Sequence, residues 1–172
     1  MGQSPSKGAT LLASANAINA VSRIFTGYVG DRLGRQNTLV LTLLLAASSV
    51  FSFWLSSIVS TTTGGSTQLW IAFIAFYSFS AGGYYALFPA LIAEVFGIRQ
   101  YAAVNAFILF VRGLGTMFGS PVGGRLLQSG GEGVGGYKGL VYWDGGLLMA
   151  ATICCVAVRW ADGKGRGWRW VA

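Results

Sequence analysis

The feature that most constrains this chain is a series of apolar blocks, each long enough for a helix to cross the hydrocarbon core of a bilayer. The blocks occupy about residues 9–29, 38–58, 69–95, 102–127 and 139–160. A polar leader (1–8) precedes them, and a basic tail (161–172), expected to be cytoplasmic, follows. The pattern predicts an all-α integral membrane protein with five transmembrane helices.

The composition supports a membrane protein and leaves little room for an enzyme. Only 10% of the residues are charged, whereas soluble domains carry about 25%. With no histidine and five acidic residues, the usual metal sites and nucleophile–base pairs cannot be assembled. We therefore expect no catalytic site, no metal and no cofactor. The net charge of +7 comes from basic residues scattered among apolar segments, so we expect contact with membrane lipid and not with nucleic acid.

The first block is the least apolar, because Asn16, Asn19 and Arg23 interrupt it at spacings of three and four residues. At 100° per residue these side chains fall within about 60° of one another, which gives the helix one polar face. A cleaved signal peptide is the competing interpretation of this end of the chain. Two asparagines and an arginine would spoil its apolar core, so we favour a first span with a polar face.

The distribution of lysine and arginine predicts how the spans are oriented. If the turn at Asp31 lies inside, the inner segments hold most of the basic residues. The inner residues are Arg32, Arg35, Arg99, Arg159, Lys164, Arg166 and Arg169, and the outer residues are Lys7, Arg125 and Lys138. This bias follows the positive-inside rule, so the Asp31 turn is expected on the cytoplasmic side.

Two arginines lie within the predicted spans, where a charged side chain costs about 2.5–3.5 kcal/mol on insertion scales. Arg23 lies about two helical turns from the Asp31 turn, and its long side chain could equally extend to the cytoplasmic interface. Arg112 lies close to the middle of the fourth span, which favours a role in a cavity. Tyr77 and Tyr84 of the third span need partners for their hydroxyl groups. They either pack in the core or line a substrate path.

Three glycines of the fourth span, Gly115, Gly119 and Gly123, repeat every four residues. They fall on the same helical face as Asn105 and Arg112. Small residues at this spacing let membrane helices approach closely. We therefore predict that these glycines form a helix-packing seam beside Arg112.

The segment from Gly27 to Gln36 resembles the signature loop of the major facilitator superfamily, Gly-x-x-x-Asp-(Arg/Lys)-x-Gly-(Arg/Lys)-(Arg/Lys). The matching positions are Gly27, Asp31, Arg32, Gly34 and Arg35. Gln36 places a neutral amide where a second cation is usual. In that family the loop is cytoplasmic and packs against a neighbouring helix to govern the rocking of two halves. The resemblance therefore implies a gating turn between the first two spans.

Two further segments resemble monocarboxylate transporters within that superfamily. Residues 19–27 resemble their eighth helix, in which an aspartate four residues before an arginine is tied to proton and substrate-anion coupling. Arg23 matches the arginine, but Asn19 stands where the aspartate would be, and an amide cannot exchange a proton near neutral pH. Residues 112–124 are similar to the eleventh helix of fungal members. The resemblance implies a partial C-terminal half of a carrier, covering about helices eight to twelve.

A fragment of a secondary transporter is the function that this resemblance implies. It would move a small organic solute, such as a monocarboxylate or a related anion, by alternating access. The candidate substrate contacts are Asn19, Arg23, Tyr77, Tyr84 and Arg112. Carriers of this kind bind substrate between two halves, so the implied partner is a missing N-terminal half or another membrane protein. The expected location is the plasma membrane or the vacuolar membrane. The alternative is a non-transporting membrane protein that assembles with or regulates a full-length carrier.

Overall fold

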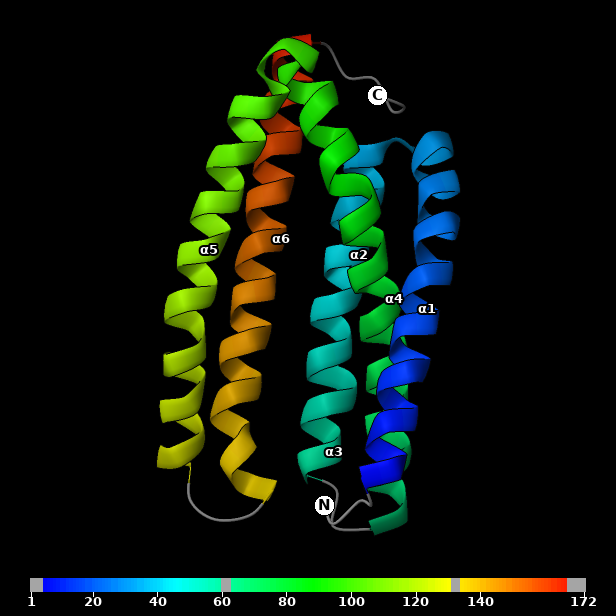
Figure 1. Cartoon of the computed structure of the whole chain (residues 1–172), viewed down its shortest axis with the longest axis vertical. Helices are drawn as coiled ribbons and strands as arrows, with labels where there is room; N and C mark the ends of the chain where they lie inside the picture. Colours follow the sequence, from blue (N-terminus) through cyan, green and yellow to red (C-terminus); the bar gives the residue numbers. More distant parts are fainter. Residues whose placement is uncertain (1–4, 60–62, 131–133, 167–172) are drawn as a thin grey trace.

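The structure of the chain is a computed structural model that describes residues 5–59, 63–130 and 134–166. Its long helices run side by side along the longest axis of the molecule (Figure 1). In chain order the elements are α1 (Pro5–Leu33), α2 (Arg35–Ser49), the π-helical turn η1 (Val50–Trp54), α3 (Leu55–Val59), α4 (Thr63–Phe96), α5 (Ile98–Ser129), the 3₁₀ turn η2 (Val134–Tyr137) and α6 (Lys138–Arg166). Because α2, η1 and α3 follow one another without a break, the described residues form five long helical segments.

Four of these segments are long and apolar enough to cross a membrane. Within the described residues they are Arg35–Val59, Thr67–Phe96, Ile98–Ser129 and Lys138–Lys164. α1 is a helix where the first span was predicted, but it is not among the four. Its polar residues explain the difference, since Asn16, Asn19 and Arg23 fall in the middle of the helix. The fifth membrane crossing, by α1, therefore stays a prediction.

Two single glycines join neighbouring helices. Gly34 lies between α1 and α2 with φ 88°, and Gly97 lies between α4 and α5 with φ 78°. Glycine adopts this left-handed backbone readily because it has no Cβ.

The predicted signature turn is wrong in extent. α1 continues through Leu33, and Gly27 is an ordinary helical residue with open space around it. A Cβ on Gly30 would lie only 2.6 Å from Leu87 Cδ2, so packing against α4 supports this last part of α1.

Polar side chains hold the C-terminal end of α6 against the start of α2. Gln36 Nε2 donates a hydrogen bond to Asp162 Oδ2 over 2.9 Å, and Arg159 Nε donates to Asn37 Oδ1 over 2.9 Å. The predicted tail began at residue 161, but α6 extends to Arg166. These two bonds stabilise the additional helical turn. They also fix the α1–α2 joint beside the end of α6.

One end of the bundle gathers most of the basic residues predicted to be cytoplasmic. The α1–α2 joint, the α4–α5 joint and the end of α6 all lie at this end (Figure 1). Its basic residues are Arg32, Arg35, Arg99, Arg159 and Lys164. Arg169 lies outside the described residues, as do residues 1–4 of the predicted leader, whereas α1 already begins at Pro5. The arrangement of the helices thus agrees with the predicted grouping of charge.

The apolar core lies where α2, α4 and α6 meet. Its two clusters of buried side chains are Leu39, Leu43 and Leu87, from α2 and α4, and Val50, Phe73 and Val141, from η1, α4 and α6. α4 also packs along α1. It is therefore the central helix, with one side in the apolar core and another side facing α1.

α1, α2 and α4 approach one another closely at small residues. A Cβ on Gly82 would collide with Ser22 Oγ of α1. A Cβ on Gly83 would lie 2.7 Å from Thr42 Cγ2 of α2 and 3.0 Å from Thr26 Cγ2 of α1. The Thr26 hydroxyl donates to the Ser22 carbonyl oxygen of its own helix over 2.6 Å, so its burial leaves no unpaired polar atom. Adjacent glycines thus create the contact between three helices.

α5 is the least packed of the long helices, since none of its residues is buried. Of the three glycines in its predicted seam, a Cβ on Gly123 would lie 3.3 Å from Leu140 Cδ1 of α6. A Cβ on Gly115 or Gly119 would meet no atom within 4 Å among the described residues. Contact at Gly123 involves α6, and the seam as a whole stays a prediction.

Candidate functional site

Two arginines from different helices meet at one tyrosine of α4. The Cζ atom of Arg23, in α1, lies 5.5 Å from the centre of the Tyr85 ring, and the Cζ atom of Arg112, in α5, lies 5.2 Å from the same centre. Arg112 Nη2 also donates a hydrogen bond to the Tyr85 hydroxyl oxygen over 2.8 Å. A guanidinium group within about 6 Å of a ring centre is attracted by the π electrons. Tyr85 therefore holds both of the arginines that the sequence placed inside separate spans.

Asn19 orients the Arg23 side chain. Arg23 Nε donates to Asn19 Oδ1 over 3.1 Å, and Asn19 Nδ2 donates to the Ser78 carbonyl oxygen of α4 over 3.3 Å. The amide thus connects the arginine to the helix that carries Tyr85. We call Asn19, Arg23, Tyr85 and Arg112 the arginine–tyrosine cluster. It unites three of the five substrate contacts predicted from the sequence.

The arginine–tyrosine cluster lies far from the helix ends and is open to its surroundings. At a rise of about 1.5 Å per residue, Arg23 lies about 15 Å from the end of α1 at Leu33, and Arg112 about 21 Å from the start of α5 at Ile98. The Tyr85 residue is 44% exposed, and both arginines are exposed. A ligand could therefore reach the cluster from the side formed by α1, α4 and α5.

The other two predicted substrate contacts, Tyr77 and Tyr84, pack against the apolar core. Tyr77 contacts the cluster around Val50, and its ring centre lies 5.3 Å from that of Phe73. Tyr84 stacks on Phe88 with ring centres 5.0 Å apart. Their role as substrate contacts stays a prediction.

Sequence reasoning missed Tyr85, which lies at the centre of the cluster. The need of buried hydroxyl groups for partners drew attention to Tyr77 and Tyr84 instead. A usable signal was nevertheless present, because Ser78, Gly82 and Tyr85 share one face of a helix. Small residues mark where another helix approaches. The large polar residue on that face is the one that meets the polar face of α1.

The signature segment forms a second charged group at the α1–α2 joint. Arg35 Nη2 lies 3.2 Å from Asp31 Oδ1, and Arg35 Nη1 lies 4.0 Å from Glu94 Oε2 of α4. The Arg32 guanidinium lies 5.3 Å from the centre of the Tyr28 ring. The Asp31 side chain is 67% exposed, so its ion pair contributes little to stability. The arrangement connects the joint to α4, the helix that also carries Tyr85.

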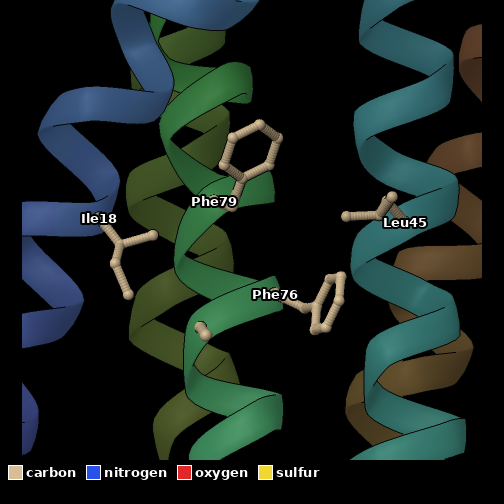
Figure 2. Close-up of a pocket in the computed structure, with 5 residues that line it drawn as sticks. Ile18, Leu45, Phe76 and Phe79 are labelled. Carbon is tan, nitrogen blue, oxygen red and sulfur yellow. The ribbon is translucent and has the colours of Figure 1, made fainter.

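An apolar groove of about 350 Å³ lies between α1, α2 and α4 (Figure 2). Its lining consists of Ile18, Leu45, Ala75, Phe76 and Phe79. These side chains are hydrocarbon, so they cannot donate or accept the hydrogen bonds that give a pocket its specificity for polar ligands. The charged and hydrogen-bonding groups of the arginine–tyrosine cluster thus contrast with this apolar groove.

The chemistry of the arginine–tyrosine cluster suits an anion. Each guanidinium group presents five N–H donors and no acceptor, and its planar fork matches the geometry of a carboxylate. The Asn19 side-chain oxygen already accepts a hydrogen bond from Arg23. In the part of the chain that the structure describes, no three side chains of the metal-binding types come together. The cluster can bind and orient an anionic group through hydrogen bonds and charge.

The apolar helices, with cations placed between them, define a multi-pass membrane protein. Comparison with known proteins identifies its family. The chain belongs to the Major Facilitator Superfamily, whose family model matches residues 1–169. The superfamily predicted from the signature segment is thereby confirmed, whereas the monocarboxylate-transporter branch and the assignment to helices eight to twelve stay predictions.

The relatives of the chain include named fungal transporters. An MFS-type transporter of Gibberella moniliformis is 32% identical over 98% of this chain and 38% of its own length. The riboflavin transporter MCH5 of Saccharomyces cerevisiae is 24% identical over 88% of this chain and 29% of its own length. The aspyridones efflux protein apdF of Emericella nidulans is 26% identical over 92% of this chain and 31% of its own length. The chain thus spans about a third of the length of these relatives. No solved structure matches it significantly.

Proposed function

We propose that this chain is part of a secondary carrier that moves a small organic anion, such as a monocarboxylate, across a membrane by alternating access. The observation that carries the proposal is the meeting of Arg23 and Arg112 at Tyr85. Among the described residues, the ion pairs involve Arg35 and neither of these two arginines. A charge placed among apolar helices is costly unless an opposite charge accompanies it. An anionic solute would supply that charge.

The position of the cluster supports a carrier. Secondary transporters bind their substrate between two groups of helices. The arginine–tyrosine cluster occupies the exposed side of α1, α4 and α5, whereas α2, α4 and α6 enclose the apolar core. The exposed side would face the other half of the carrier. That half would be the missing N-terminal half or another membrane protein.

The charged group at the α1–α2 joint would act as the gate. Arg35 connects Asp31 of α1 with Glu94 of α4, and this end of the bundle carries the basic residues expected in the cytoplasm. Ion pairs that remain partly exposed are weak, about 0–1 kcal/mol each. Contacts of that strength can open and close as two halves rock.

The proposed substrate class follows from the residues of the site and not from the names of relatives. Two relatives are named for different molecules, riboflavin and aspyridones. The Asn19 amide cannot take up a proton near neutral pH, so the proposal includes anion binding at Arg23 without proton exchange at Asn19. The plasma membrane or the vacuolar membrane is the proposed location.

Binding of butyrate to the purified chain in lipid nanodiscs tests the proposal. Arg23→Gln and Arg112→Gln should each weaken binding about tenfold, because each removes one charge-assisted hydrogen-bonding group. Arg125→Gln is the matched control, since Arg125 lies on α5 outside the cluster. Unchanged butyrate affinity in both cluster variants would contradict an anion site.

A second candidate is a non-transporting membrane protein that assembles with or regulates a full-length carrier. The observation that favours it is α5, which has no buried residue and could pack against another protein. Particle size in detergent and butyrate flux into reconstituted vesicles distinguish the two candidates. An oligomer that carries butyrate supports the carrier, whereas a partner-bound species without flux supports the second candidate.

A further inference from the structure

Tyr85 contacts two different arginines with two parts of its side chain, the hydroxyl group and the ring. Its hydroxyl oxygen accepts the hydrogen bond from Arg112 Nη2 over 2.8 Å, and the face of its ring attracts the guanidinium of Arg23 from 5.5 Å. Arg112 also lies 5.2 Å from the ring centre. The distance between the two cations is therefore set by one rigid side chain of α4.

Each acceptor oxygen of the cluster already accepts a hydrogen bond, and many of its N–H donors remain available. Asn19 Oδ1 accepts from Arg23, and the Tyr85 oxygen accepts from Arg112. One N–H of the Asn19 amide donates to the Ser78 carbonyl oxygen. The donors that remain for a ligand are the unused N–H groups of both guanidinium groups, the second N–H of Asn19 and the O–H of Tyr85. A ligand that fits this set must present oxygen acceptors.

The charges of the cluster are also unbalanced. Within the described parts of the chain, Asp31 and Glu94 pair with Arg35, and Asp162 accepts a hydrogen bond from Gln36. Neither Arg23 nor Arg112 forms an ion pair with a described carboxylate. Two cations that share one ring in a medium of low dielectric constant are best neutralised by two negative charges. A ligand with one carboxylate would leave one charge uncompensated.

We infer that Tyr85 positions Arg23 and Arg112 as a single receptor for two negative charges, and that its preferred ligand is an organic dianion of the dicarboxylate class. This inference rests on the proposed function, because it assigns a substrate class to the same anion site. Tyr85 acts through the two arginines and is therefore a positioning residue that sets the charge preference of the site.

Equilibrium binding of labelled succinate and butyrate to the purified chain in lipid nanodiscs tests the inference. The two probes have the same chain length but differ by one carboxylate. Succinate should bind about tenfold more tightly than butyrate, because its second carboxylate meets the second guanidinium group. Tyr85→Leu, which removes both the hydroxyl and the ring, should abolish this preference. Tyr85→Phe, which keeps the ring, should retain part of it.

The ratio of the two affinities separates positioning from a general loss of structure. A variant that merely unfolds part of the chain would lower the binding of both probes equally and leave the ratio unchanged, and this result for Tyr85→Leu would overturn the inference. Tyr28→Leu is the matched control, since its ring also holds an arginine, Arg32, but lies outside the cluster. It should preserve the preference for succinate.

The inference and the proposed function fail in different ways. If Arg23→Gln and Arg112→Gln weaken the binding of both probes but the unaltered chain binds succinate and butyrate equally, the dianion inference is wrong and the anion site stands. If these two substitutions change the affinity for neither probe, the inference and the proposed function are both wrong.

Discussion

Tyr84 and Tyr85 are neighbours in the chain, yet they belong to two regions of different character. Tyr84 faces the packed region, in which α2, α4 and α6 surround buried side chains such as Leu87. Tyr85 faces the open region, where it is 44% exposed and contacts Arg23 and Arg112. One helix thus contributes to a core with one face and to a polar site with another.

The difference between the two regions shows which interactions matter in a membrane helix bundle. In lipid every apolar side chain is surrounded by hydrocarbon, so apolar character alone does not bring helices together. The packed region depends on a close fit between side chains, because dispersion attraction is strongest between atoms in contact. The open region depends on charge and hydrogen bonds, which gain strength where water is scarce.

Removing a packed side chain should have the largest effect on stability. Leu87 is 3% exposed, and Leu87→Ala should cost about 2–5 kcal/mol because it leaves a cavity. Leu114 of α5 is 41% exposed, and lipid or detergent can fill the space left by Leu114→Ala, so its cost should be within about 0.5 kcal/mol. Unfolding of both variants in detergent micelles measures the difference. Equal losses would show that apolar content, and not fit, stabilises the packed region.

Adding a methyl group where α1 and α4 touch should have an intermediate effect on the free energy of unfolding. Gly82→Ala places a methyl group against Ser22, and this overpacking should cost about 1–3 kcal/mol. Because α1 must move, the Arg23 guanidinium should also leave Tyr85, and succinate binding should fall. Gly115→Ala is the control, since its Cβ meets open space and should raise helix stability by as much as about 1 kcal/mol. If Gly82→Ala unfolds no more easily than Gly115→Ala, α1 does not pack closely on α4.

Removing the side-chain amide of Gln36, at the start of α2, should have the smallest effect on the free energy of unfolding. Gln36 is 5% exposed, and Gln36→Leu removes its hydrogen bond to Asp162, at a cost of about 1 kcal/mol. Gln100 occupies an exposed position just after the other joint, so Gln100→Leu is a suitable control and should change stability by less than about 0.5 kcal/mol. The same unfolding measurement applies. A loss at Gln100 as large as that at Gln36 would argue against the attachment of α6 to α2.

The helices could be predicted from the sequence, whereas the site could be predicted only in part. The block 38–58 became the continuous segment Arg35–Val59, because a long apolar stretch has few other stable conformations in lipid. Arg23 and Arg112 were identified by the cost of charge in an apolar span. Their meeting point, Tyr85, depends on how α1, α4 and α5 pack, and hydropathy does not contain that information. The helical end of α1 was missed because the contact of Gly30 with Leu87 outweighs the low helix propensity of glycine.

The joint at Gly97 has a consequence for evolution and engineering of this protein. A connection of one residue cannot absorb a change in chain length, so each residue inserted between Gly97 and Arg112 would turn the arginine about 100° around its helix axis. The guanidinium would then point away from α4 although every side chain of the cluster was still present. The number of residues between that glycine and that arginine is therefore as much a property of the site as the residues themselves.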